Sequence, residues 1–261
     1  MILRRNQFAL FRTMVRRDIR ARYQGTLFGI FWNLLNPLLM LAIYSSVFLL
    51  VFKARWHMEG SEEANYALML FVGILTHAFM AEVLTSCANV VRNNSNLVKK
   101  VVFPVEILPL VNVSSAGVNY LLGLGLTLVF AISQGYLGQW WVLLYLPLIL
   151  LIYMLTLCAL GYLFAILGLY IRDVVQMLPM LITILMFTST VFFSVHSAPA
   201  SLGKYLYLNP ISVIADSIRA VLYGMSPDQL PLLILFIVSC ISYLFTYTLF
   251  RRLQPSFSDA L

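Results

Sequence analysis

The sequence predicts an all-α, polytopic membrane protein with six transmembrane helices. Of its 261 residues, 61% are hydrophobic and only 10% are charged. Soluble domains carry about 45–50% apolar and about 25% charged residues, so this chain lacks the charged surface that a water-soluble protein of its size needs. Its apolar runs are also much longer than the roughly 10-residue strands of an outer-membrane barrel, which excludes that class of membrane protein.

Residues 1–28 are predicted to form a cytoplasmic amphipathic helix before the first span. Phe8, Phe11, Val15 and Ile19 recur at steps of three and four residues and therefore share one helical face, whereas arginines occupy the opposite side. Such a helix typically lies in the plane of the cytoplasmic leaflet. Two roles remain open for it: an electrostatic anchor to anionic membrane lipids, and a lateral brace against a cytoplasmic partner.

Six apolar runs are long enough to cross a bilayer. They are Gly29–Phe52, Ala67–Val91, Ile107–Ser133, Val142–Tyr170, Met177–Val195 and Leu230–Phe250. At about 1.5 Å per residue, the first run would be about 36 Å long, which spans the membrane with some tilt. This run is about twice as long as the apolar part of a signal peptide, so we expect it to remain as an uncleaved first span.

The distribution of Lys and Arg predicts that both termini are cytoplasmic. One side of the predicted membrane carries Arg4, Arg5, Arg12, Arg16, Arg17, Arg20, Arg22, Arg92, Lys99, Lys100, Arg172, Arg251 and Arg252. The opposite side carries only Lys53, Arg55, Lys204 and Arg219. The positive-inside rule places the richer side in the cytoplasm. The even number of spans independently requires both termini to lie on one side.

Two connections between spans are predicted to carry structure of their own. The cytoplasmic segment Arg92–Val105 is basic, starts with polar residues and is closed by Pro104, which predicts a short exposed helix. The external segment 196–229 contains a predicted helix, Ile211–Tyr223, which is too short to cross a bilayer and is therefore interfacial or re-entrant. Its ends carry residues suited to capping: Asn209, Pro210 and Gly224.

Polar residues fall on one face of three predicted spans. These residues are Glu82, Thr85, Ser86, Asn89, Asn112, Ser115, Asn119, Thr183, Thr190 and Ser194. Hydrogen bonding between helices is the ordinary explanation of such stripes. Glu82 has two open interpretations, a hydrated path or an ion pair within the bundle, because an ionisable group at membrane depth is costly. Asp216 and Arg219, spaced i, i+3 on the external helix, are expected to pair.

No catalytic or metal-binding pattern is recognisable. His57, His77 and His196 lie in different segments without metal-ligand spacing, and the phosphate-binding motif G-x-x-x-x-G-K-[ST] is absent. We therefore expect a transport subunit and not an enzyme. This chain is expected to bind no cofactor, no metal and no nucleic acid, and to hydrolyse no ATP by itself.

Five segments, spread over nearly the whole chain, form a recognisable set. They are RRDIRARYQGTLFGIFWNLLNPLL at 16–39, NLVKKVVFPVEILPL at 96–110, LYIRDVVQMLP at 169–179, YLNPISVIADSIRAVLYG at 207–224 and LQPSFSDAL at 253–261. In this order and within a six-span frame, they resemble the membrane subunit of type-2 ABC (ABC-2) exporters. The resemblance is to the branch that moves bacterial O-antigen, capsule and teichoic acid.

The resemblance implies a single ABC-2 transmembrane domain over residues 1–261, placed in the bacterial inner membrane. It divides into an amphipathic helix, five spans, an external gate segment, a sixth span and a tail, at 1–28, 29–195, 196–229, 230–250 and 251–261. It also implies a homodimer that works with two copies of an ATPase subunit, which carries ATP and Mg²⁺, and a lipid-linked glycan as substrate.

The same resemblance assigns roles to residues found above. Coupling to the ATPase falls to segment 92–105, with Asn94, Asn96, Leu97, Lys99, Lys100, Phe103 and Pro104. The gate helix beside it offers guanidinium groups for the pyrophosphate of a lipid carrier, on Arg16, Arg17, Arg20 and Arg22. The expected translocation path includes Trp32, Asn36, Tyr44, Glu82, Phe187, Thr190 and Phe193. The expected external gate includes Asn209, Pro210, Asp216 and Arg219.

Three other functions compete with polysaccharide export. A drug- or lipid-exporting ABC-2 transporter shares the fold, and the terminal QPSFSDAL and the FPVEILPL stretch argue for the polysaccharide branch instead. A secondary transporter or channel would need coupling acids near the midplane, and Glu82 alone is weak support for it. A membrane-embedded enzyme would need acids or histidines clustered at one membrane face, which the sequence lacks.

Overall fold

A computed structural model describes residues 5–25, 31–47, 55–58, 61–99, 103–136, 143–195, 199, 203 and 205–261. Its helices are α1 (Arg5–Tyr23), α2 (Trp32–Ser45), α3 (Tyr66–Asn93), α4 (Ser95–Val98), α5 (Ile107–Ser133), α6 (Tyr145–Tyr170), α7 (Arg172–Phe187), α9 (Pro210–Leu222) and α10 (Gln229–Leu253), with a 3₁₀ turn, η5, at Gln254–Ser256. Two short strands, β1 (Arg55–Met58) and β2 (Ser61–Asn65), add an antiparallel hairpin that the sequence reading did not include.

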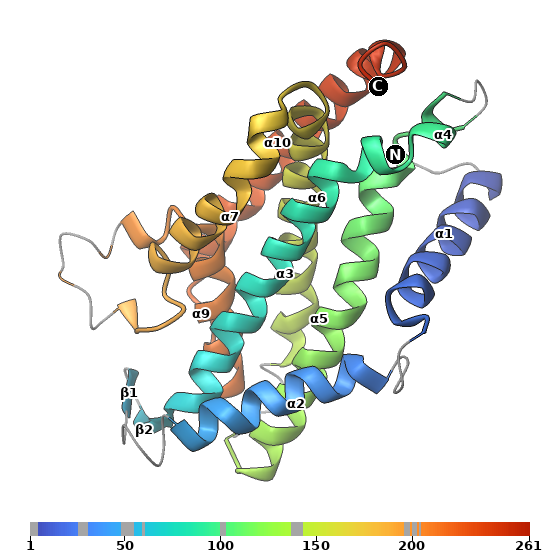
Figure 1. Cartoon of the computed structure of the whole chain (residues 1–261). Coiled ribbons are helices and arrows are strands. Elements are labelled where there is room, and N and C mark those ends of the chain that lie inside the picture. Colours follow the sequence, from blue (N-terminus) through green and yellow to red (C-terminus); the bar gives the residue numbers. More distant parts are fainter. Residues whose placement is uncertain are drawn as a thin grey trace.

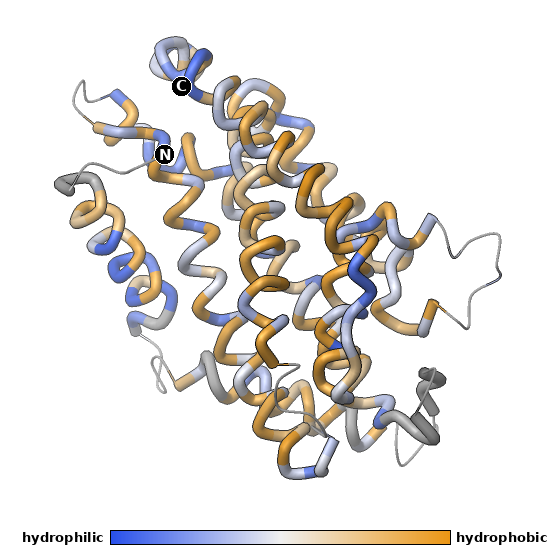
Figure 2. The backbone as a smooth tube through the Cα atoms, turned by 180° about the vertical axis from the view of Figure 1, so that it is seen from behind, coloured by the Kyte–Doolittle hydropathy of each residue, from blue (hydrophilic) through white to orange (hydrophobic). Residues whose placement is uncertain are grey.

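Four helices in the described part of the chain are long and apolar enough to cross a membrane. They are α3, α5, α6 and the continuous stretch Gln229–Ser256, which comprises α10 and η5. These helices run side by side, with α3 at the centre of the bundle (Figure 1). Apolar residues dominate them along their length (Figure 2). They match the second, third, fourth and sixth predicted spans, and the chain is a multi-pass membrane protein.

Within the described residues, the first and fifth predicted spans contain helices shorter than the predicted runs; residues 29–30 and 48–52 of the first run lie outside the described residues. α2 has 14 residues and contains Pro37, and α7 has 16 residues and contains Pro179. At about 1.5 Å per residue they reach about 21 and 24 Å, less than the roughly 30 Å apolar thickness of a bilayer. In Figure 1, α2 runs across α3 and α5 and not along them. Six full spans therefore remain a prediction.

Two hydrophobic cores hold the bundle together. The larger core lies between α3, α5, α6 and α9 and includes Phe79, Tyr153 and Ile214. The smaller core lies at the end of the bundle that carries α4 and the C-terminus (Figure 1). α3 and α6 approach closely at Gly168, where a side-chain carbon would lie 2.0 Å from the carbonyl oxygen of Ala88. Only glycine permits this contact, as at other tight crossings of membrane helices.

α1 packs beside α5 and does not lie across the end of the bundle (Figure 1). Met14 is buried on the smaller core, and Leu10, Phe11 and Val15 pack around it, whereas Phe8 is exposed. Of the predicted apolar face, Phe11 and Val15 are therefore confirmed as packing residues, whereas Phe8 is not. Its partner is α5 and the smaller core, because these surfaces offer the helix apolar contacts within the protein.

Candidate functional site

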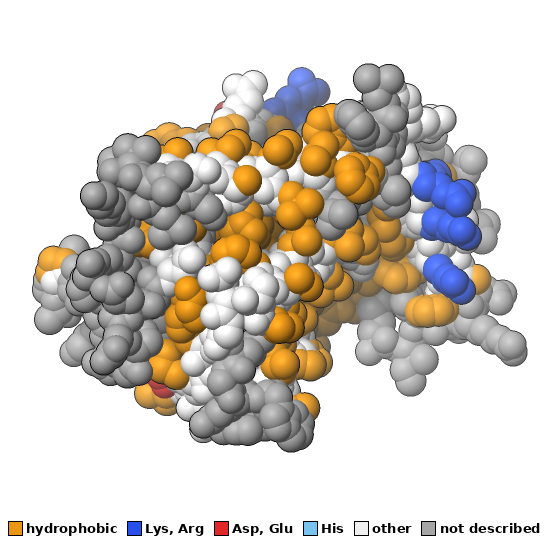
Figure 3. All heavy atoms as spheres, turned by 90° about the horizontal axis from the view of Figure 1, so that it is seen from below, with side chains coloured by type: hydrophobic (Ala, Val, Ile, Leu, Met, Phe, Trp, Pro, Cys, Tyr) orange, Lys and Arg blue, Asp and Glu red, His pale blue; other side chains and the backbone are white. Residues whose placement is uncertain are grey.

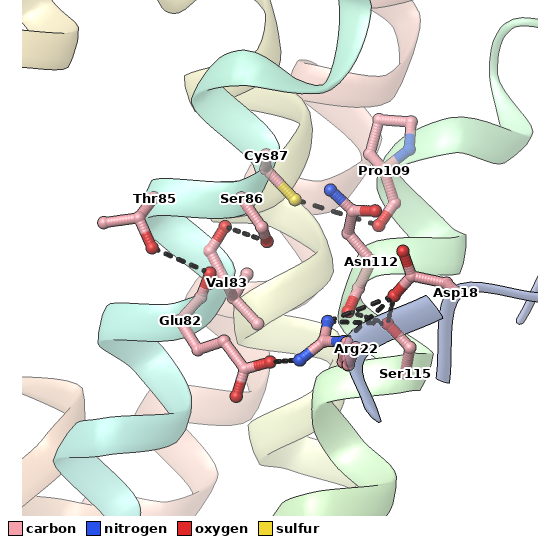
Figure 4. Close-up of polar contacts among 10 residues, drawn as sticks. All are labelled: Asp18, Arg22, Glu82, Val83, Thr85, Ser86, Cys87, Pro109, Asn112 and Ser115. Atoms are coloured by element: carbon pink, nitrogen blue, oxygen red, sulfur yellow. Dashed lines mark hydrogen bonds and ion pairs between the residues drawn. The ribbon is translucent and has the colours of Figure 1, made fainter. Parts of the chain in front are cut away.

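Three helices meet at a polar cluster around Arg22. Its guanidinium forms an ion pair with Glu82 of α3 through Nη1. Nη2 also donates to a carboxylate oxygen of Asp18, at 3.1 Å, and to the hydroxyl of Ser115 on α5, at 3.0 Å. Ser115 in turn donates to Asp18, at 2.5 Å. We call these four residues the Arg22 cluster (Figure 4); it ties the C-terminal turn of α1 to α3 and α5.

The Arg22 cluster is partly exposed and carries a surplus of negative charge. The side chains of Arg22, Glu82 and Asp18 are 25%, 32% and 35% exposed. Two carboxylates share one guanidinium, so each ion pair is weaker than it would be alone, and partial exposure screens both. Of the two interpretations of Glu82, the observed contact corresponds to pairing within the bundle.

Other polar residues of the α3 stripe bond to their own helix. The Thr85 hydroxyl donates to the carbonyl of Ala81, at 2.8 Å, and the Asn89 amide donates to that of Thr85, at 3.1 Å. Figure 4 shows Thr85 pointing away from the Arg22 cluster, and the Ser86 hydroxyl donates to the carbonyl of Val83, at 3.3 Å. The polar groups of the predicted stripe therefore mostly form hydrogen bonds within α3. Among the α3 residues drawn in Figure 4, only Glu82 forms an ion pair with another helix.

Four other arginines of α1 form a separate exposed surface. Arg12, Arg16, Arg17 and Arg20 border an open groove of about 860 Å³ along the helix. Figure 3 shows basic side chains gathered at this edge of the molecule. Arg22 points the other way and is engaged by protein groups. We call the four outward residues the arginine row; the structure thus separates Arg22 from Arg16, Arg17 and Arg20, with which the resemblance had grouped it.

In the described residues of the predicted coupling segment, α4 is a short helix of four residues. Asn96 and Lys99 are exposed, whereas Leu97 and Phe103 pack against the smaller core. The Asn94 amide donates to the carbonyl of Val90, at 2.8 Å, so it caps the end of α3. Pro104 accepts a hydrogen bond from the Ile107 amide at the start of α5, and Lys100 lies outside the described residues. The segment therefore presents polar side chains outwards and apolar ones inwards.

At the other end of the molecule, Arg219 of α9 is buried, with 1% of its surface exposed. Its Nε and Nη2 donate to the carbonyl of Met69 on α3, and its Nη1 donates to that of Thr190, at 2.7 Å. Nη2 also donates to the carbonyl of Val191, and Nη1 to the carboxylate of Asp216, at 2.8 Å. A guanidinium has five N–H donors, and all five are used. We call these five residues the Arg219 cluster.

The Arg219 cluster confirms the predicted i, i+3 pair and adds partners that the sequence did not indicate. Thr190 donates its hydroxyl to Asp216, at 3.0 Å, and its amide to the hydroxyl of Ser212, at 3.1 Å. Gly73 makes room for the guanidinium, because a side-chain carbon there would lie 2.5 Å from Nη2 of Arg219. The non-helical backbone that follows α7 therefore has its carbonyls satisfied by an arginine, which membrane-embedded backbone requires.

Asn209 and Pro210 begin α9 as predicted. The Asn209 side chain accepts the Ile211 amide, at 3.0 Å, while its amide group donates to the carbonyl of Leu185 in the last turn of α7, at 2.8 Å. One residue thus caps the start of one helix and the end of another. Gly224, with φ of 71°, follows the C-terminal end of α9.

Two tyrosines complete the attachment of this region to the start of α3. The Tyr66 hydroxyl donates to the carbonyl of Phe192, at 2.8 Å, and the Tyr223 hydroxyl accepts the amide of Asn65, at 2.6 Å. Burial raises the pKa of Tyr223 to about 12, so its hydroxyl stays neutral near pH 7. The predicted external gate is consequently a hydrogen-bonded junction of α3, α7 and α9.

The structure does not gather the expected translocation-path residues around one space. Glu82 belongs to the Arg22 cluster and Thr190 belongs to the Arg219 cluster. Phe187 on α7 and Asn36 on α2 are exposed. Phe187 stacks on Phe192, with ring centroids 5.6 Å apart. Trp32 and Phe193 are half-buried, and the side chain of Tyr44 lies outside the described residues. Their role in a path remains a prediction.

Several residues in or beside the two clusters were not identified from the sequence. Asp18 lies four residues before Arg22, a spacing that by itself indicates an ion pair on a helix. Gly73 and the carbonyl of Met69 left no signal, because their role depends on an arginine about 150 positions away. Within the described residues, no group of three or more His, Cys, Asp and Glu side chains is suited to hold a metal ion. The charged groups of both clusters join helices.

Comparisons with known proteins agree with this architecture. The family model of the ABC-2 type transporter matches residues 9–223. The O-antigen export system permease protein RfbA of Myxococcus xanthus is 27% identical over 252 residues, which cover 95% of this chain and 94% of that protein. A protein of the same name from Klebsiella pneumoniae is 24% identical over 254 residues, which cover 97% and 95% of the two chains. The chain therefore belongs to the ABC-2 type transporter family.

Proposed function

We propose that this chain is the permease subunit of an ATP-driven exporter that moves lipid-linked O-antigen polysaccharide across the inner membrane. The observation that carries this proposal is its similarity, over nearly the full length of both chains, to O-antigen export permeases of two bacteria. Similarity over 95–97% of this chain supports a shared role more strongly than a match of a few transmembrane helices would.

A separate ATPase subunit supplies the energy in this proposal. The sequence contains no phosphate-binding motif, and α4 presents Asn96 and Lys99 to the solvent at one end of the bundle. Closure of two ATPase subunits around ATP and Mg²⁺ would push on α4 in each copy of the permease. The movement would open a path between two copies of this chain, through which the glycan passes outward.

The arginine row is proposed to hold the pyrophosphate of the lipid carrier. Its four guanidinium groups are exposed, lie beside one groove and are free of the carboxylates that hold Arg22. Guanidinium binds phosphate oxygens in pairs and keeps its charge at any physiological pH. Within the arginine row, we assign this role to Arg16, Arg17 and Arg20, which the resemblance implies, and we assign Arg22 to the attachment of α1.

Deletion of the gene tests the proposed function. Cells without the permease should retain lipid-linked O-antigen on the cytoplasmic leaflet and lose it from the surface, and a plasmid copy should restore both. Normal surface polysaccharide in the deletion strain would contradict the proposal. Loss of drug or lipid export, with surface polysaccharide unchanged, would identify another branch of the family.

A triple replacement of Arg16, Arg17 and Arg20 by Gln tests the pyrophosphate assignment. Export should fall while the amount of protein in the membrane stays normal. Replacement of Arg251 and Arg252, which are also exposed but lie at the end of α10, serves as the matched control. Normal export by the triple variant would rule out the assignment and leave the exporter itself unaffected.

A further inference from the structure

The C-terminal tail is folded back onto the bundle. After α10 and η5, the ring of Phe257 is fully buried in the smaller core, together with Val90 and Leu169. The hydroxyls of Ser256 and Tyr170 lie 2.6 Å apart and form a hydrogen bond. Chain ends are usually poorly ordered unless specific contacts hold them. A buried phenylalanine and a hydrogen bond to the end of α6 are such contacts.

Aromatic rings connect this tail to the middle of α6. The ring of Phe257 packs edge-on against Phe250 of α10, with centroids 5.0 Å apart, and Phe250 packs in the same way against Tyr162 of α6, at 5.2 Å. All three side chains are fully buried. Edge-to-face pairs of this kind contribute about 0.5–1.5 kcal/mol each beyond the area they bury. The three rings form a continuous, closely packed row.

Both ends of the coupling segment are attached to the helix that this row supports. At its start, Nη2 of Arg92 donates to the carbonyl of Leu169 in the last turn of α6, at 2.8 Å. At its far end, the hydroxyl of Tyr162 donates to the carbonyl of Glu106, at 2.8 Å. α6 therefore holds the segment on both sides of α4, and Tyr162 belongs to the attachment and to the aromatic row alike.

From these contacts we infer that the C-terminal tail, through Phe257, Phe250 and Tyr162, is a brace that positions the coupling segment. Closely packed cores transmit displacement because they do not deform continuously. A push on α4 therefore moves α6, and with it the core, only while the tail keeps the three rings in contact. Without Phe257, the coupling segment would deform locally under the push of the ATPase, and α6 would not move with it. This inference rests on the proposed function of the segment as the docking site of the ATPase.

The test replaces Phe257 by Ala in the full transporter with its ATPase subunit. Phe245→Ala is the matched control, because it removes the same ring from the preceding helix α10 at a position that is 64% exposed. Phe257→Leu tests whether a buried apolar side chain of similar size restores the brace. ATP hydrolysis and export of lipid-linked glycan are measured on the same preparations, together with hydrogen exchange of the backbone at residues 103–107.

We expect Phe257→Ala to keep ATP hydrolysis within about twofold and to lower the glycan exported per ATP by about five- to tenfold, the size of a typical coupling between sites. Hydrogen exchange at 103–107 should rise. Phe257→Leu should recover most of the export, and Phe245→Ala should match the wild type. The inference is overturned if Phe257→Ala exports as much per ATP as Phe245→Ala, or if its only effect is loss of the protein from the membrane.

Failure of the proposed function would give a different result. If wild-type permease exported no glycan, or if replacement of Asn96 and Lys99 left its assembly with the ATPase intact, the assignment of the coupling segment would be wrong. Hydrogen exchange on the permease alone would still test the brace. Unchanged protection of 103–107 in Phe257→Ala would refute it.

Discussion

The two arginine clusters use the same residue in different ways. Each arginine sits near an acidic residue of its own helix, four positions from Asp18 in one case and three from Asp216 in the other, and each joins three segments of the chain. Arg22 is 25% exposed and contacts mainly side chains, whereas Arg219 is 1% exposed and donates mainly to backbone carbonyls. Side-chain partners can rotate away, but carbonyls move only with the backbone that carries them. The Arg219 cluster is therefore a fixed junction, and the Arg22 cluster is a contact that can change.

This difference has a functional consequence under the proposed function. The Arg219 junction holds the end of α7, the start of α3 and α9 as one unit, so we expect this region to move as a body. The Arg22 cluster lies at the C-terminal end of α1, beside the arginine row. Asp18 lies on α1 with Arg22, so Arg22 keeps one carboxylate partner if α1 shifts relative to α3 and the contact with Glu82 opens. Adjustment during transport is therefore expected at α1.

The largest effect is expected for Arg219→Met. Removal of one partner from a buried ion pair destabilises a protein by about 3–5 kcal/mol, because it leaves the other charge uncompensated, here that of Asp216. Arg219→Lys should restore little, since an ammonium group has three donors and lacks the planar shape that reaches three carbonyls. Thermal unfolding in detergent and the amount of protein in the membrane measure the effect. Stability within about 0.5 kcal/mol of wild type would refute the fixed junction.

Gly73→Ala should have the next largest effect. The new methyl group would meet Nη2 of Arg219 at 2.5 Å and the backbone of Val191 at 2.9 Å, neither of which can withdraw. Overpacking of this kind costs about 1–3 kcal/mol. Gly125→Ala on α5 is the control, because nothing lies within 4 Å of its new methyl group and alanine favours the helix by about 1 kcal/mol. Equal unfolding temperatures of the two variants would contradict the geometry of the Arg219 cluster.

Charge reversal at the Arg22 cluster should cost less. Glu82→Arg places two arginines together, and Arg22→Glu places three carboxylates together, whereas the double variant restores an opposite pair. We expect each single variant to lose about 1 kcal/mol and the double variant to recover part of it, since partly exposed pairs contribute only about 0–1 kcal/mol. A double-mutant cycle on thermal unfolding measures the coupling. A coupling energy of zero would mean that the contact with Glu82 does not hold α1.

The smallest effect on stability is expected for the arginine row. Replacement of Arg16, Arg17 and Arg20 by Gln should leave the free energy of unfolding within about 0.5 kcal/mol of wild type, because these side chains have no structural role at the exposed face of α1. Thermal unfolding of the triple variant and of the wild type in the same detergent checks this. A large loss of stability would show that these arginines make contacts that stabilise the fold, as Arg22 does.

Sequence reasoning predicted the parts of the fold that depend on local pattern. The apolar runs identified α3, α5, α6 and α10 as spans, because length and hydropathy alone decide whether a helix is stable in a bilayer. The capping preferences of Asn209 and Pro210 located the start of α9, since a cap acts within a few residues. The pairing of Asp216 with Arg219 followed in the same way from helical spacing.

The partners of Arg22 and Arg219 could not be predicted from the sequence. Pyrophosphate binding was assigned to Arg22 together with its neighbours, because all the arginines of α1 look alike in the sequence. The turn of the helix directs Arg22 to Glu82 and the others to solvent. The junction of Arg219 with Met69, Thr190 and Val191 could not be predicted either, since its partners are backbone carbonyls, which every residue possesses.

The sequence by itself therefore determined that this is a helical membrane protein, where its main spans lie and which family it resembles, because hydropathy, spacing and capping act locally along the chain. Only the tertiary structure decided which charges are buried, which are exposed and what the C-terminal tail does. Those outcomes depend on the contacts that Arg22, Arg219 and Phe257 make with residues far away in sequence. Burial and desolvation are set by such neighbours and not by the residue itself.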